Sequence, residues 1–142
     1  MIKLSRAECL AFMMAQPRTG KIATVRPDGR PHVAPIWFIL DGEHLLFTTW
    51  HATAKANNIR HNPWVSICVD DETPPFAFVK ADGTAELLDD LALLRKWATL
   101  IAGRYMGESQ AEAYGTRNAV AGELLVRVTL ASIHGERDIA GW

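Results

Sequence analysis

The sequence predicts one α+β domain, in which a mainly antiparallel sheet of about six strands closes toward a barrel and helices lie at its flanks. Short β-rich segments follow one another in hairpin order, and Pro27-Asp28-Gly29 and Asp41-Gly42 supply turn signals between them. Helical periods are confined to the start of the chain, one short insertion and a stretch after residue 89. The 142 residues fit a single core, so we assign residues 1–142 to one domain.

The first fifty residues predict a helix followed by a meander of strands. Ser5 and Glu8 form a capping-box pattern, and the helix they begin should end before Pro17. Gly29 is available for positive φ in a tight turn after a strand of small residues, and the third strand is rich in aromatic and β-branched residues. The strands are expected at 21–26, 31–40 and 45–49.

The rest of the chain predicts a short polar helix, further strands and a helical pair. Thr53 can cap a helix that runs through Arg60, and Asn62-Pro63 stops it because the residue before proline leaves the α region. Strands are expected at 65–69, 76–87 (with a bend at Asp82-Gly83) and 123–133, and helices from Asp89 or Asp90 past Ile101 and over 109–121.

The composition argues against several kinds of partner and compartment. Fifteen Lys and Arg against sixteen Asp and Glu give a net charge of −1, which does not supply the basic field that non-specific nucleic-acid binding needs. Cys9 and Cys68 lie among apolar residues and do not make a disulfide framework. We expect a reducing cytoplasm, no signal peptide and no membrane partner.

Several well-known kinds of active site have little support in the sequence. Neither a Gly-x-Gly-x-x-Gly loop nor a Gly-x-x-x-x-Gly-Lys-Ser/Thr loop is present, and no Gly-x-Ser-x-Gly elbow presents a nucleophile. The five histidines are isolated from other ligands, so no metal site is predicted. Asp70, Asp71 and Glu72 are expected to form a solvated loop rather than an acid/base pair.

Three segments resemble a known family. They are Gly20-Lys21-Ile22-Ala23-Thr24-Val25, Arg26-Pro27-Asp28-Gly29-Arg30-Pro31-His32-Val33-Ala34-Pro35-Ile36-Trp37-Phe38 and Lys55-Ala56-Asn57-Asn58-Ile59-Arg60-His61-Asn62-Pro63-Trp64-Val65, followed by Gly83-Thr84-Ala85. Their order and spacing resemble the split β-barrel superfamily that contains the pyridoxamine 5′-phosphate oxidases and the deazaflavin-dependent oxidoreductases. Within it, the chain is most similar to the small reductases that use coenzyme F-420. The resemblance implies a six-stranded FMN-binding split barrel.

The resemblance also implies an activity and an assembly. It implies an oxidoreductase that transfers a hydride between F-420 and a small conjugated or electrophilic substrate, with the cofactor in a groove at a homodimer interface. The alternatives are an oxidoreductase that uses flavin mononucleotide (FMN) and a non-catalytic module that stores or carries a flavin or a haem. The segment 134–139 does not resemble the ending of the vitamin B6 phosphate oxidases, which argues against pyridoxamine phosphate as the substrate.

The resemblance implies a set of cofactor-binding residues. Lys55, in the first turn of the polar helix, is expected to bind the phosphate, and small or rigid residues let the backbone approach a flat ring. The set is Lys55, Arg60, Asn58, Thr48, Thr49, Ala34, Pro35, Ile36, Trp37, Arg30 and His32. No catalytic residue is assigned; His32 is the best candidate for a proton donor, and it or Arg30 could meet the cofactor's polar tail or the substrate.

On the residues alone, other roles stay open for part of this set. Lys55 and Arg60 could be solvated helix charges, and Asn58 could simply end a short helix. Trp37 and Phe38 should point to opposite faces, one into the core and the other toward the groove. Pro35 should lie at a sheet edge or bulge. Trp142 is expected to be disordered or to fold over a partner's groove.

Overall fold

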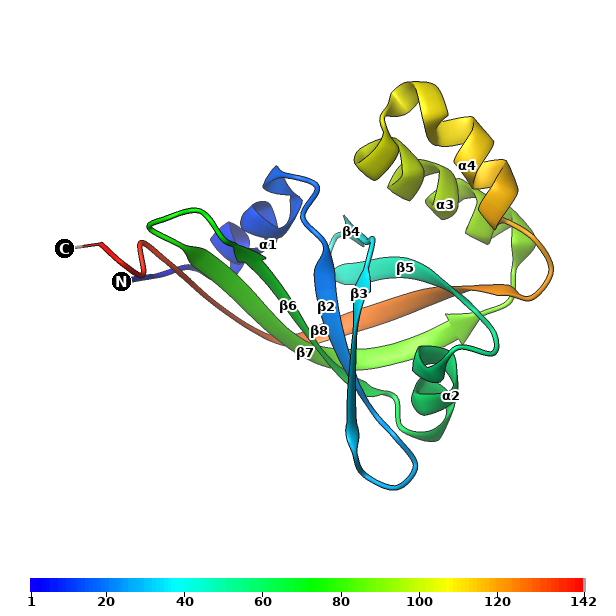
Figure 1. Cartoon of the computed structure of the whole chain (residues 1–142), viewed down its shortest axis with the longest axis horizontal. Helices are drawn as coiled ribbons and strands as arrows, with labels where there is room; N and C mark the ends of the chain where they lie inside the picture. Colours follow the sequence, from blue (N-terminus) through cyan, green and yellow to red (C-terminus); the bar gives the residue numbers. More distant parts are fainter. Residues whose placement is uncertain (142) are drawn as a thin grey trace.

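The computed structural model describes residues 1–141, so the prediction for Trp142 falls outside the described residues (Figure 1). The elements in chain order are β1 (Ile2–Lys3), α1 (Arg6–Ala15), β2 (Gly20–Val25), β3 (Pro31–Ile36), β4 (Ile39–Asp41), β5 (His44–Trp50), α2 (Ala54–His61), β6 (Trp64–Asp71), β7 (Ala77–Leu88), α3 (Leu91–Met106), the 3-10 turn η1 (Glu108–Gln110), α4 (Ala111–Asn118) and β8 (Glu123–Arg137).

The sheet is antiparallel throughout, and the predicted fold class is confirmed. Its strands lie in the order β3-β2-β6-β7-β8-β5-β4, with β1 pairing to the far end of β8. The described part of the chain has eight strands rather than six. One extra strand is β1, which is too short to recognise by periodicity, and the other arises because the single arm predicted over 31–40 is two strands, β3 and β4.

The sheet curls because its two outermost strands are neighbours in the sequence. β3 and β4 end the strand order on opposite sides, yet only Trp37 and Phe38 separate them along the chain. Three Cα–Cα steps join Ile36 to Ile39 and span at most about 11 Å when extended, so the sheet must bend round to bring these edges together. No ladder joins β3 to β4 within residues 1–141, which leaves the barrel split at this seam.

Side chains of α3 bind the backbone at the seam, where the described residues provide no strand partner. The N–H of Phe38 donates to the Tyr105 hydroxyl at 3.2 Å, and the Phe38 carbonyl accepts from the Arg104 guanidinium. Arg104 also donates to the Met13 and Gln16 carbonyls at the end of α1, each at 2.8 Å. Buried backbone groups need partners, and α3 supplies them here.

The break at 37–38 explains how the second arm departs from the prediction. Phe38 is fully buried in the core, whereas Trp37 keeps 41% of its surface exposed, so the two side chains separate as expected. Pro35 lies in β3, which in the described part of the chain pairs only with β2. β3 is therefore an edge strand, as the proline predicted.

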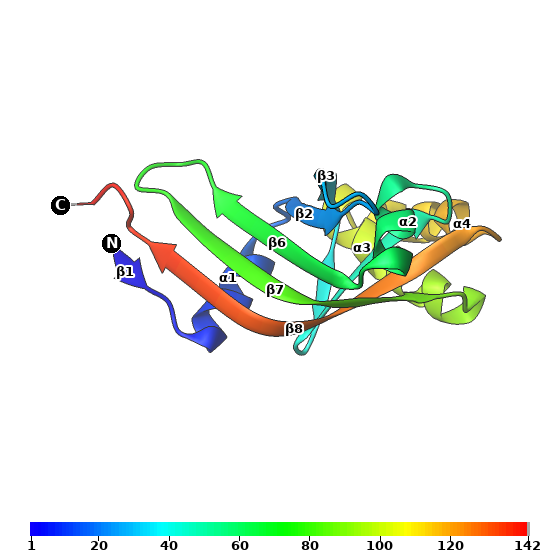
Figure 2. The same ribbon diagram turned by 90° about the horizontal axis from the view of Figure 1, so that it is seen from below.

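Long strands β7 and β8 form the spine of the sheet, and β6 lies beside them (Figure 2). Their ladder shifts register between Asp82 and Gly83, which confirms the predicted bend. A Cβ on Gly83 would lie 2.3 Å from the Thr129 carbonyl oxygen, so only glycine fits there. β8 extends four residues past the predicted 133, because its far end pairs with β1 and the start of β7.

The acidic segment after Val69 differs from the predicted solvated loop. Asp70 and Asp71 belong to β6, where Asp70 pairs with Lys21 at 2.9 Å and Asp71 with Arg18 at 3.2 Å. Both carboxylates therefore connect β6 to neighbouring segments, while Glu72 is exposed as expected.

The helices lie on two sides of the sheet. α1 begins at the predicted Ser5 capping box, and α3 begins at Asp90, whose carboxylate accepts from the Leu93 N–H. α3 and α4 form a hairpin over β4 and β5 (Figure 1). α4 is shorter than the predicted 109–121, because η1 takes up its first residues and the helix ends at Asn118. Leu94 packs with Leu46 and Leu125 in a small second core beneath this insert.

Two sequence expectations concern the whole chain. Cys9 and Cys68 are free thiols, as expected. Within residues 1–141, no helix has the length and apolar character needed to cross a membrane.

Arg104→Leu should lower the free energy of unfolding by about 2–4 kcal/mol, because the Phe38 and Met13 carbonyls lose their donor. Urea unfolding at one fixed protein concentration measures this. Arg95→Leu is the control, since exposed Arg95 donates, within residues 1–141, only to the Thr116 hydroxyl. Equal losses in the two variants would contradict the role given to Arg104.

Candidate functional site

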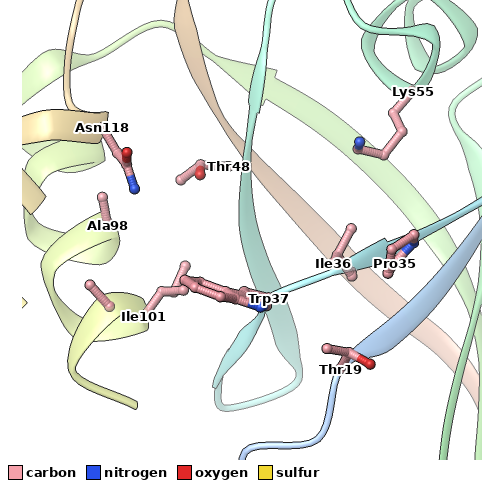
Figure 3. A pocket seen from close by; sticks show the side chains of 10 residues that line it. Thr19, Pro35, Ile36, Trp37, Thr48, Lys55, Ala98, Ile101 and Asn118 are labelled. Atoms are coloured by element: carbon pink, nitrogen blue, oxygen red, sulfur yellow. The ribbon is translucent and has the colours of Figure 1, made fainter. Parts of the chain in front are cut away.

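A hollow of about 430 Å³ lies between β3, β5, α2 and the α3–α4 insert. We call it the ring hollow (Figure 3). It is lined by Thr19, Pro35, Ile36, Trp37, Thr48, Lys55, Ala98, Ile101, Ala102 and Asn118. Among these lining residues Lys55 carries the one charge, and the walls are otherwise apolar or neutral polar. This size and chemistry suit a small organic ligand with one anionic group.

Lys55 is placed by the junction between β5 and α2. The Thr53 hydroxyl caps α2 by accepting from the Ala56 N–H at 3.3 Å, and it also bonds to the Thr49 hydroxyl at 2.7 Å and the Trp50 carbonyl at 3.1 Å. These bonds fix the first turn of the helix against the end of the strand. The half-buried Lys55 ammonium is directed toward the hollow (Figure 3), where the helix N-terminus also favours an anion.

Trp37 forms a flat surface beside the hollow. Its ring stacks on that of Tyr105, with centroids 5.1 Å apart and planes 4° from parallel. The Tyr105 hydroxyl accepts from the Phe38 N–H and donates to the Arg18 carbonyl at 2.8 Å, and these two hydrogen bonds hold the Tyr105 ring in place. The seam that splits the barrel therefore also holds an aromatic ring at the hollow.

The insert supplies the opposite wall. Ala98, Ile101 and Ala102 on α3 are each at most 6% exposed, and the half-buried Asn118 ends α4. Sequence reasoning predicted helices here but did not assign any of these residues to a site. The apolar period of α3 identifies its buried face, yet nothing local indicates that this face borders a ligand hollow.

A carboxyl lies close to Thr48 and Lys55. In the β5–β8 ladder Glu123 pairs with Trp50, and Thr48 pairs with Leu125, so Glu123 and Thr48 are diagonal neighbours on one face. Burial raises the pKa of Glu123 above its usual value, while hydrogen bonding with Thr48 and the charge of Lys55 act in the opposite direction. Burial is the largest of the three effects, so the carboxyl holds its proton to higher pH than a free glutamate.

A second hollow, of about 490 Å³, lies on the other side of α2, between this helix and the β2–β3 turn. We call it the basic hollow. It is lined by Arg26, Pro27, Asp28, Arg30, His32, Ala54, Asn57 and Asn58. Arg30 is paired with Asp28 at 2.8 Å. Arg26 Nε and His32 Nδ1 are buried, and neither has a hydrogen-bond partner within residues 1–141, which is uncommon for buried polar atoms.

The predicted cofactor-binding residues divide into three sets. The ring hollow contains Pro35, Ile36, Trp37, Thr48 and Lys55; the basic hollow contains Arg30, His32 and Asn58; and Ala34, Thr49 and Arg60 line neither. Arg60 donates to the His51 carbonyl and the Asn57 amide oxygen, and buried Asn58 donates to the Thr24 hydroxyl at 3.0 Å. His32 lies away from the ring hollow, and its proton-donor role stays a prediction.

Metal ligands do not gather anywhere in the described residues 1–141. No group of three or more His, Cys, Asp or Glu side chains in this part of the chain is placed to hold an ion.

Glu123→Gln should stabilise the protein increasingly as pH rises from about 4.5 to about 8. A carboxyl whose pKa is raised by folding adds stability below its ordinary value of 4.5, and that contribution is lost as pH rises through the folded pKa. The glutamine keeps the neutral form throughout. Urea unfolding across this range tests it, with Glu112→Gln on α4 as the control; a constant difference between Glu123→Gln and wild type would contradict the assignment.

The chain matches known proteins over most of its length. Residues 6–135 match the sequence profile of the pyridoxamine 5′-phosphate oxidase family. In solved structures, a conserved hypothetical protein from Mycobacterium tuberculosis is 25% identical with a TM-score of 0.81, covering 96% of this chain and 88% of its own.

Two further structures carry functional names. A structure described as an F420 reductase is 31% identical with a TM-score of 0.68, covering 87% of this chain and 94% of that one. An FAD-binding protein from Mesorhizobium loti is 26% identical with a TM-score of 0.69, covering 94% of both chains. The resemblance to the split β-barrel superfamily is confirmed, and the match over residues 6–135 shows that this chain belongs to the pyridoxamine 5′-phosphate oxidase family.

Proposed function

We propose that this protein is an oxidoreductase that transfers a hydride between coenzyme F-420 and a small conjugated or electrophilic substrate. The observation that carries the proposal is the ring hollow, in which Lys55 is the one charged lining residue and lies across from a fixed tryptophan. Membership of a family of flavin-binding oxidoreductases supports a redox enzyme with a flavin-type cofactor.

The residues of the ring hollow fit such a cofactor. The Lys55 ammonium and the Thr48 hydroxyl would hold the phosphate through charge-assisted and neutral hydrogen bonds. The Trp37 indole offers its plane to a flat ring, and the edge strand at Pro35 allows close approach of the backbone. The bound coenzyme supplies hydride transfer, which the protein's own side chains do not provide.

The chain's own groups would orient the reactants and keep water out. The buried wall of Ala98, Ile101 and Ala102 excludes water from one side of the hollow. Thr19, Thr48 and Asn118 are neutral polar groups that orient without changing protonation. No catalytic proton donor is assigned in the ring hollow, and solvent can supply a proton that accompanies the hydride.

The basic hollow favours F-420 over a simpler flavin. An anionic tail that continues past α2 would meet Arg26, Arg30 and His32, where two buried nitrogens have no partner within residues 1–141. The 31% identity to an F420 reductase supports the same choice. The role proposed for Arg30 and His32 is therefore to bind the tail of the cofactor.

FMN-dependent oxidation or reduction is the alternative within the same fold. The ring hollow alone would serve FMN, because that cofactor needs one phosphate anchor and one ring site. The 26% identity to an FAD-binding protein supports a flavin as the cofactor. The other alternative is a non-catalytic protein that stores or carries a flavin or a haem.

We also propose a cytoplasmic location, which is expected from the two unpaired cysteines.

We also propose a homodimer whose interface covers the outer face of the sheet. A hollow of about 490 Å³ lies there, lined by Lys21, Ala23, Val33, Ser66, Ile67, Cys68, Lys80, Asp82, Ser132, Ile133 and His134. Val33 is 68% exposed at this hollow, so a second copy would cover an apolar side chain that otherwise faces water. Val33 and Pro35 lie on the same face of edge strand β3, so a second copy over Val33 would reach the rim of the ring hollow.

Lys55→Ala should weaken cofactor binding by about 1.5–3 kcal/mol, the scale of a lost charge-assisted hydrogen bond. Titration of the purified protein with F-420 and with FMN, followed by tryptophan quenching, measures this and also identifies the preferred cofactor. Lys96→Ala, an exposed lysine on α3, is the control. Binding of FMN without binding of F-420 would overturn the favoured cofactor, and unchanged affinity in Lys55→Ala would remove Lys55 from the site.

Val33→Asp should convert the dimer to a monomer, because the interface would have to bury an unpaired carboxylate. Light scattering during size-exclusion chromatography measures the mass. Val120→Asp is the control, since Val120 is 45% exposed in the loop after α4. A monomeric wild type, or a Val33→Asp dimer, would refute this interface.

A further inference from the structure

Asn118 occupies a distinct place in the ring hollow. It comes from α4, while the nearest wall is formed by Ala98 and Ile101 of α3, and Figure 3 shows its amide directed into the hollow on the side of Thr48. Lys55 lies across the hollow from it (Figure 3). The hollow thus has a cationic side, at Lys55, and a neutral hydrogen-bonding side, at Asn118.

The wall between these sides is suited to a planar molecule. Trp37 presents a ring held nearly parallel to Tyr105, and the nearby α3 wall has the small side chains Ala98 and Ala102. An aromatic plane and small side chains leave room for a flat ring, and offset stacking on an indole stabilises it. A planar ligand seated here would have its edges, not its faces, available for hydrogen bonds.

The position of Asn118 is fixed by close packing between α3 and α4. A Cβ on Gly115 would lie 2.0 Å from the Thr99 hydroxyl oxygen, so the helices touch at a point that only glycine permits. Thr99 is adjacent to Ala98, and Gly115 is one turn before Asn118. The Ala119 N–H donates to the Gly115 carbonyl at 3.0 Å, which closes the last turn of α4. Asn118 is therefore held in a fixed relation to the apolar wall.

We propose that Asn118 recognises the carbonyl-bearing edge of a planar ring bound in the ring hollow. The amide offers one acceptor and two donors, so it matches a carbonyl or an adjacent C=O and N–H pair. Two sources share this chemistry: the dione edge of a flavin-type cofactor ring, and the carbonyl of a quinone or enone substrate. The inference rests on the proposed function for the identity of the ring but not for the recognition itself.

The test uses two tricyclic probes of similar shape. Lumichrome carries a dione edge and no phosphate, and phenazine carries no carbonyl; equilibrium dialysis against the full chain gives both affinities. Wild type should bind lumichrome more tightly than phenazine. Asn118→Leu should lower the affinity for lumichrome by about three- to ten-fold, while the affinity for phenazine stays unchanged or rises. Glu112→Leu, an exposed change on the same helix, should alter neither. Thermal unfolding of each variant verifies that it is folded.

A second arm separates the two sources. If Asn118→Leu weakens the binding of lumichrome, Asn118 recognises the cofactor ring. If the substitution weakens the binding of menadione, a quinone, but not of lumichrome, Asn118 recognises the substrate. Both results support the inference. Three results would overturn it. The wild type binds none of these probes, Asn118→Leu loses equal affinity for phenazine and lumichrome, or Asn118→Leu loses affinity for neither lumichrome nor menadione. Neither tricyclic probe needs Lys55, so this result is independent of whether F-420 or FMN binds.

Discussion

The hydrogen bonds that α3 gives to the backbone of Phe38 hold both the barrel and its candidate site. A sheet that ends at β3 on one side and β4 on the other has no ladder across its seam in the described residues. Tyr105 and Arg104 satisfy the groups that a strand would otherwise pair. The same two residues connect the insert to the end of α1 and to the loop before β2.

This constraint links folding to ligand binding through Trp37. Phe38 already fills the core at the seam, so the side chain of Trp37 points away from the core. The Trp37 ring instead stacks on Tyr105 at the wall of the ring hollow. On the opposite side, the cap of α2 fixes Lys55 by hydrogen bonds to the end of β5. The proposed flavin-type ring would thus bind between two preorganised elements, which lowers the entropic cost of its positioning.

Local chemistry was enough to predict much of the fold. The Ser5 capping box, the Thr53 cap and the bend at Gly83 each depend on a few neighbouring residues, and each is present. Lys55 and Trp37 were assigned through family resemblance, and the structure brings both to one hollow. Non-local packing could not be derived in this way. The splitting of the second arm depends on Arg104 and Tyr105, and Asn118 reaches the hollow only because α4 packs on α3.

The most direct measurement is a crystal structure of the protein with F-420 bound. Our account predicts the phosphate against Lys55, the ring beside Trp37 and the tail continuing toward Arg30 and His32. A cofactor found elsewhere, with no contact to Lys55 or Trp37, would contradict the assignment of the ring hollow as the redox site.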